Sequence, residues 1–264
     1  MRLSKLKQVL LWELHDAWAF PFAEILIIGF FSQTLSITFI SYGAIDESGF
    51  LSGGMDITRF ITFLRMEYPV IIFCTLIPAK VFGECIEKRK VHIPLMAGAS
   101  RNELFISKLV VTVLLIWIVQ LGSLTVEAVL NQMFAFPISV AAWVSTLIGV
   151  LMFSLFVCSF SILLSVLLKR FSLATLAGIG LLAILNYWAF QMPLENLAGY
   201  LSPMRSALVV EEAIHIPLAQ AMADAHVYPM HPPLIQSFSI PYLLLLPLVF
   251  MLAAALVFKV IDLD

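Results

Sequence analysis

The chain has 264 residues, of which 61% are apolar and only 12% are charged, and its mean hydropathy is strongly positive. So few charges cannot cover the surface of a water-soluble domain of this size, which excludes that class. The formal net charge of -2 is spread along the chain and gives no indication of a nucleic-acid partner.

Residues 2–18 are predicted to form an amphipathic helix. Apolar residues share one stripe, and polar residues lie mostly opposite: Arg2, Lys5, Gln8, Glu13 and Asp16. A helix of this kind lies in the membrane surface rather than across it. Its acids interrupt the apolar stretch that a secretory signal requires, so we expect no cleaved signal peptide.

Six segments are predicted to cross a membrane, because a spanning helix needs roughly 20 consecutive apolar residues. They are residues 19–41, 60–82, 109–130, 139–168, 173–190 and 240–260. Between the last two, the amphipathic, proline-containing segment 192–238 is expected to form short re-entrant or surface helices, for example around 208–216. The predicted fold is one all-α integral membrane domain with an N-terminal interfacial elbow helix.

The basic residues predict how this domain is oriented. Twelve of the fifteen fall on one side of the six-span arrangement: Arg2, Lys5, Lys7, Lys80, Lys88, Arg89, Lys90, Arg101, Lys108, Lys169, Arg170 and Lys259. Because basic loops stay inside the cell, we expect a multi-pass protein of the cytoplasmic (plasma) membrane with both termini in the cytoplasm. The segment 192–238 would then face outward.

The loop 83–108 is the most charged stretch of the chain. Ser100 with Glu103 three positions later forms a capping box, which predicts a helix that begins near Arg101 and continues into the third span. Before it, Ile93, Leu95 and Met96 form a small apolar knob. The loop is either a solvated connection or a segment whose knob inserts into a groove on a cytoplasmic partner.

This loop resembles the signature region of ABC-2 type transporter permeases. In that family an acid at the end of the second span is followed about fourteen positions later by a Pro-x-Ser-Arg-like turn and then by a lysine, seven positions further on, that opens the third span. Glu87, Ser100–Arg101 and Lys108 stand at those spacings. The chain departs from the family pattern in three places: Lys90–Val91 replace its Gly-Thr after the acid, Gly98 or Ala99 replaces the proline of the turn, and Ser107 replaces the glycine that often precedes the lysine. The likeness in span number and order extends over nearly the whole chain.

The resemblance implies a permease subunit of an ATP-binding-cassette transporter, with a coupling helix in the loop that docks on a separate ATPase. The docking residues it implies are Glu84, Glu87, Arg89, Ile93, Leu95, Met96 and Arg101. The chain has no Gly-Lys dipeptide and hence no P-loop lysine, so ATP and Mg²⁺ would bind the partner, and this chain would hold no cofactor. A second permease copy, identical or paralogous, would complete the transporter. The substrate stays open.

Four polar residues inside spans are candidates for a transport pathway, because such groups are costly in lipid: Glu24, Gln120, Glu127 and Asn186. An interhelical hydrogen bond is the alternative explanation for each.

The outer segment carries three weak metal-ligand candidates, His215, His226 and His231, with methionines nearby that would suit copper(I). Their spacing is not that of a metal site, so we predict no bound metal. Cys74, Cys85 and Cys158 are interpreted as packing residues.

Two other functional classes remain open. An intramembrane enzyme would need a nucleophile or metal motif, and the spans contain none, so no catalytic residue is predicted. A non-transporting anchor or regulator of a cytoplasmic ATPase would carry the same loop.

Overall fold

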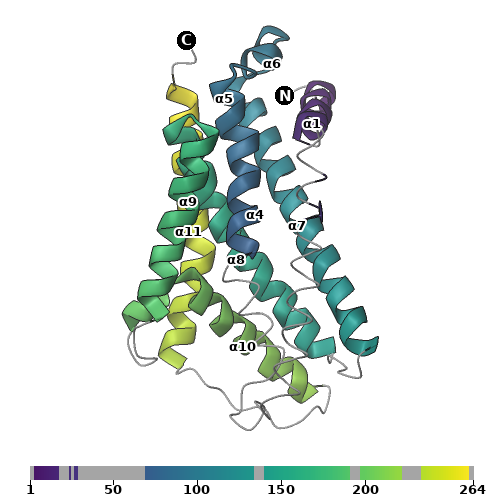
Figure 1. The fold of residues 1–264 in the computed structure, drawn as a ribbon, viewed down its shortest axis with the longest axis vertical. Helices are drawn as coiled ribbons and strands as arrows, with labels where there is room; N and C mark the ends of the chain where they lie inside the picture. Colours follow the sequence, from purple (N-terminus) through teal and green to yellow (C-terminus); the bar gives the residue numbers. More distant parts are fainter. Residues whose placement is uncertain are drawn as a thin grey trace.

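The computed structural model describes residues 3–17, 24, 27–28, 69–133, 140–190, 197–221 and 233–261. Within these ranges the chain is almost entirely helical and contains no strand (Figure 1). Four helices contain a segment long and apolar enough to cross a membrane: α7 (Arg101–Met133), α8 (Val140–Leu168), α9 (Phe171–Phe190) and α11 (Pro233–Val260). They coincide with four of the six predicted spans.

The other two predicted spans are described only in part. Most of residues 19–41 and all of 60–68 lie outside the described residues. The second span is represented by α4 (Pro69–Pro78), which continues into a short π-helix, η2 (Ala79–Glu84). Pro78 stands at this change because its ring removes a backbone donor and displaces the preceding turn. The six-span arrangement therefore stays a prediction.

α8 is the central helix of the bundle and packs against α4, α7, α9, α10 and α11. Small side chains on its buried faces allow this close approach. The hydroxyls of Ser154, Ser159 and Ser165 donate to carbonyl groups of the same helix, so these residues can be buried without a partner on another helix. The serine-rich face is thus a packing surface.

The predicted outer segment contains a short 3₁₀ turn, η3 (Leu197–Leu201), and one long helix, α10 (Pro203–Ala221). The helix is longer than the short stretch expected around 208–216. It packs against α8 and α11, and Figure 1 shows it lying obliquely across the end of the bundle opposite α6. Its two acids, Glu211 and Glu212, are buried there.

The opposite end of the bundle gathers segments that are far apart in the sequence. α1 (Leu3–Ala17), α5 (Cys85–Glu87) and α6 (His92–Met96) lie there together with the end of α11 (Figure 1). The count of basic residues predicted that these segments share one side. Which side of a membrane they occupy stays a prediction.

Three described residues adopt the left-handed backbone conformation with positive φ. Gly98, which follows α6, has φ 84°, whereas Arg89 after α5 and Lys169 after α8 both have φ 56°. This conformation ends a helix and costs glycine little. In other residues it costs roughly 1–2 kcal/mol, so two basic residues occupy positions where glycine would be less strained.

Candidate functional site around Lys108

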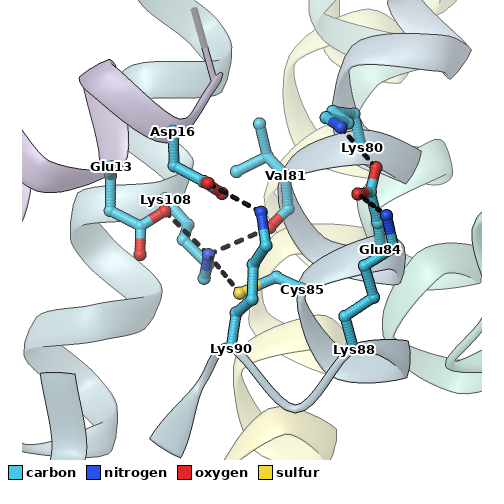
Figure 2. A network of polar contacts seen from close by, with 9 residues as sticks. All are labelled: Glu13, Asp16, Lys80, Val81, Glu84, Cys85, Lys88, Lys90 and Lys108. Atoms are coloured by element: carbon cyan, nitrogen blue, oxygen red, sulfur yellow. Dashed lines mark hydrogen bonds and ion pairs between the residues drawn. The ribbon is translucent and has the colours of Figure 1, made fainter. Parts of the chain in front are cut away.

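Lys108 lies in the second turn of α7 and is completely buried. Its Nζ donates to Glu13 Oε2 at 2.7 Å and to the carbonyl oxygen of Val81 at 3.0 Å, and lies 3.1 Å from Cys85 Sγ (Figure 2). These partners belong to α1, η2 and α5. One ammonium group therefore ties three segments to α7, and its burial depends on their acceptors.

Glu13 is the anionic partner of Lys108 and is only 1% exposed. Burial raises the pKa of the Glu13 carboxyl, against the opposing attraction of Lys108. The sequence placed Glu13 on the polar face that a surface helix would turn toward water. For Glu13 that expectation is wrong, because its side chain is buried against Lys108 of α7. Gln8 of the same face is exposed as expected, and Ala17 of the apolar stripe packs in the core. The distribution of polar residues around a single helix cannot reveal an ion-pair partner that lies 95 positions away in the sequence.

A second ion pair supports the same docking of α1. Lys90 Nζ lies 2.7 Å from Asp16 Oδ1, and both side chains are about 30% exposed. Partial burial lowers the pKa of Lys90, but the hydrogen bond that Lys90 donates to Asp16, together with the attraction of the nearby negative charges, outweighs it and the net shift is upward. α1 is thus held by one buried and one half-buried pair.

Glu84 ends the π-helix and pairs with two lysines of its own segment. Its carboxylate oxygens lie 2.5 Å from Lys80 Nζ and 2.6 Å from Lys88 Nζ (Figure 2). Burial alone would raise the pKa of Glu84, but the hydrogen bonds from both lysines outweigh it and lower the pKa. The charge of Glu84 is therefore neutralised within its own segment, by Lys80 and Lys88.

The capping box predicted at the start of the third span is confirmed. Ser100 Oγ accepts the Glu103 N–H at 3.2 Å, and Glu103 Oε2 accepts the Ser100 N–H at 2.9 Å. α7 begins at Arg101 as the sequence indicates and runs without a break through the third span.

Arg101 and Glu87 each satisfy backbone groups at the end of another helix. Arg101 Nη1 donates to the carbonyl oxygens of Lys259 and Ile261, both at 2.8 Å, where the last helix ends. Glu87 Oε2 accepts the N–H of Phe171 at 3.0 Å, at the first residue of α9. Both contacts complement the partial charges of helix termini, so the loop is fastened to α9 and α11.

The short helix α6 carries the exposed apolar residues of the loop. Ile93 is 54% exposed and Met96 is 81% exposed, whereas Leu95 packs partly against the core. Between α6 and α1 lies a groove of about 250 Å³ lined mainly by apolar side chains, among them Trp12 and Pro94. The apolar knob predicted from the sequence is therefore displayed at a surface.

The residues implied for docking thus divide into two groups. Arg89, Ile93 and Met96 are exposed and available to a partner. Glu84, Glu87, Leu95 and Arg101 contact other parts of the chain. Docking itself stays a prediction, but these contacts give the second group a structural role.

Three of the four pathway candidates have side chains that the structure describes. Glu24 is exposed, and the Glu127 side chain lies outside the part of the chain that the structure describes. Gln120 is 1% exposed, and its Oε1 has no hydrogen-bond partner. Asn186 Oδ1 accepts the hydroxyl of Ser202 at 2.6 Å, which favours the interhelical hydrogen bond proposed as the alternative.

The histidine candidates give no metal site among the described residues, which contain no group of three potential ligands. His215 Nδ1 lies 3.4 Å from Ser145 Oγ on α8. His226 and His231 fall outside the described ranges.

Sequence reasoning missed two buried polar features. One is the Glu13–Lys108 pair, for which an acid in an amphipathic helix and a lysine at the start of a span were the only signals. The other is Glu211, whose Oε1 accepts the hydroxyl of Thr146 at 2.8 Å. At Gly149 of α8, an added Cβ would lie only 3.3 Å from the Glu211 Cβ, so glycine permits this close contact.

No protein-family model, curated protein or solved structure matches this chain.

Proposed function

We propose that this chain is the membrane-spanning permease subunit of an ABC-2 type transporter, driven by ATP hydrolysis on a separate subunit. One observation carries the proposal. Glu87, Ser100, Arg101 and Lys108 stand at the family-like spacings, and three of them bind other segments of the chain. A loop that only connected two spans would not need such contacts.

The contacts would let the loop transmit force. Lys108 joins it to α1 and η2, Glu87 to α9, and Arg101 to the end of α11. A displacement of α6 by a partner would therefore act on several helices at once, because packed elements move as units. In this proposal α6 meets the ATPase through Ile93 and Met96.

The remaining features of the proposal follow from the resemblance and the sequence. The subunit has six spans, with an interfacial α1 and both termini in the cytoplasm of a plasma membrane. A second copy or a paralogous permease completes the transporter, and ATP and Mg²⁺ bind only the partner ATPase. The substrate class is left open.

The test is an affinity pull-down of the tagged chain from native membranes. The variant Ile93→Ser/Met96→Ser changes only exposed side chains, so it should fold normally and fail to recover an ATP-binding subunit. Met133→Ser is the matched control, because Met133 is 76% exposed on α7 and outside the loop. If wild type recovers no ATP-binding subunit, the proposal fails.

Glu87→Ala and Arg101→Ala are poor choices for this test because they would also loosen α9 and α11. A static anchor of an ATPase would pass the pull-down as well. Maleimide labelling of the variant Gln120→Cys distinguishes a permease from such an anchor. The rate of labelling at this buried position should rise during ATP turnover in a permease and should stay unchanged in an anchor.

A further inference from the structure

The turn between α8 and α9 is unusually basic for two adjoining apolar helices. It consists of Lys169 and Arg170, which separate the candidate spans Val140–Leu168 and Phe171–Trp188. Both side chains are exposed. Because two spans end at this turn, its side chains lie at the level where the hydrocarbon layer meets the lipid headgroups.

The turn after α5 lies beside it. Glu87 accepts the Phe171 N–H at 3.0 Å, and an added Cβ at Gly83 would lie 3.4 Å from the carbonyl of Arg170. Arg89, two residues after Glu87, is exposed. The structure therefore brings Arg89 to the neighbourhood of Lys169 and Arg170 from a segment 80 positions earlier in the chain.

These three bases have no acidic partner among the described residues. The acids nearby already have contacts: Glu84 pairs with Lys80 and Lys88, and Glu87 caps α9. The Phe171 N–H is neutral and leaves the charge of Glu87 in place, so the three bases and this one acid leave a net positive charge at this surface, which suits an anionic group.

The surface next to these bases is apolar. Leu167 is 50% exposed, Leu168 is 37% exposed, and Leu173 and Leu176 of α9 are 46% and 71% exposed. These leucines belong to the two candidate spans, so lipid acyl chains would cover them in a membrane and the headgroups of the same lipids would lie beside the bases. A phospholipid covers both parts, because its acyl chains lie on the leucines and its phosphate meets the bases.

The backbone supports a functional reason for the charges. Arg89 and Lys169 are the two described non-glycine residues with positive φ. Glycine is the usual residue at such helix ends. Interaction with the helix dipole favours a cation anywhere in the last turn, so it does not explain why the strained position itself is basic.

We propose that Arg89, Lys169 and Arg170 form a binding site for the phosphate of an anionic phospholipid whose acyl chains lie against the leucines of α8 and α9. The site requires only that the chain lies in a membrane, so it does not depend on the transporter function. A free phosphate shares the headgroup chemistry, and the experiment separates the two.

The test measures lipid retained by the purified full chain in native mass spectrometry. Phosphatidylglycerol is compared with phosphatidylcholine carrying the same acyl chains. Wild type should prefer phosphatidylglycerol, and the variant Arg89→Gln/Lys169→Gln/Arg170→Gln should lose this preference by about a hundredfold, since each base near an anionic membrane contributes about fivefold. Equal retention of both lipids by wild type would overturn the proposal, because it would show that the three bases do not select an anionic headgroup.

Two further arms make the result specific. Lys7→Gln removes an exposed base of α1 at the same end of the bundle. If it reduces the preference for phosphatidylglycerol as much as the triple variant does, the preference reflects general surface charge and not a defined site. Millimolar inorganic phosphate should displace little phosphatidylglycerol, because it cannot contact the leucines. Full displacement would identify a free-phosphate site and refute the lipid assignment.

The variant Arg89→Gly/Lys169→Gly separates binding from folding. Glycine relieves the positive-φ strain, so the melting temperature of the variant should equal or exceed that of wild type. Its preference for phosphatidylglycerol should nevertheless fall about twenty-fivefold. A glycine variant that keeps the full preference would contradict the proposal.

Discussion

Removal of the Glu13 carboxylate is expected to release α1 from the bundle. In Glu13→Leu, the completely buried Lys108 loses its anionic partner and keeps only the Val81 carbonyl and the Cys85 thiol. Breaking a buried ion pair at one partner costs about 3–5 kcal/mol. For a chain of this size that corresponds to a fall in melting temperature of roughly 6–20 °C.

Lys108→Met, which removes the other partner of the pair, should lower the stability by a similar amount because it leaves the Glu13 carboxylate buried without a cation. The double variant Glu13→Leu/Lys108→Met replaces the pair with apolar groups and should lie within about 1–2 kcal/mol of wild type or above it. The three variants form a double-mutant cycle, in which the coupling should reach at least about 4 kcal/mol, because the two single losses together far exceed the loss in the double variant.

Two measurements report the effect in detergent-solubilised protein. Thermal unfolding followed by helical circular dichroism gives the overall loss of stability. Maleimide labelling of Cys85, located by mass spectrometry, reports the local release of α1, since this thiol is buried beneath α1 and next to Lys108. Glu24→Leu is the control, because Glu24 is exposed.

The reasoning would be refuted if Glu13→Leu melted within 1 °C of wild type with Cys85 still protected. It would also be refuted if the effects of the two single substitutions simply added in the double variant, because additivity means that the two side chains do not interact.

Three other predictions use contacts at defined positions. Gly178→Ala should destabilise the fold by about 1–3 kcal/mol, because the new Cβ would lie 2.5 Å from Thr75 Cγ2. Adding Thr75→Ser removes that methyl group and should restore the melting temperature. The control Gly122→Ala should be neutral or stabilising, because its Cβ would meet no atom within 4 Å. Arg101→Lys should cost about 1–2 kcal/mol and speed amide exchange at the end of α11, because a lysine cannot hold both carbonyls as the guanidinium does. The pKa of Glu84 is below its usual 4.5, so its ion pairs stabilise the fold above pH 4.5 and are lost as the pH falls through the lowered value; Glu84→Gln should be less stable than wild type at pH 7 and should approach it in acid melts, and a constant difference between pH 7 and pH 3 would contradict this.

Local patterns predicted much of the helical framework. The apolar runs located α7, α8, α9 and α11 because each run is long enough to be read without knowledge of its neighbours. The start of α7 was predicted near Arg101, where the helix begins, since the capping box formed by Ser100 and Glu103 lies within four positions of sequence.

The candidate site could be predicted only in part, because its contacts are made between distant segments. Arg101 and Glu87 were interpreted as surface residues for a partner, since nothing near them in sequence shows that they meet the ends of α11 and α9. Glu13 was expected to face water for the same reason, since its partner Lys108 is far away in sequence. Charge in an amphipathic segment indicates that a polar partner is needed but not whether the partner is water or a buried lysine.

The contact between Arg101 and the last helix also has a consequence for how the chain is made. Its acceptors are the carbonyl groups of Lys259 and Ile261, which are synthesised more than 150 residues after Arg101. During translation this contact can therefore form only after the final turn of α11 has left the ribosome. A chain truncated before residue 259 would lack both acceptors and would leave the Arg101 guanidinium without this contact.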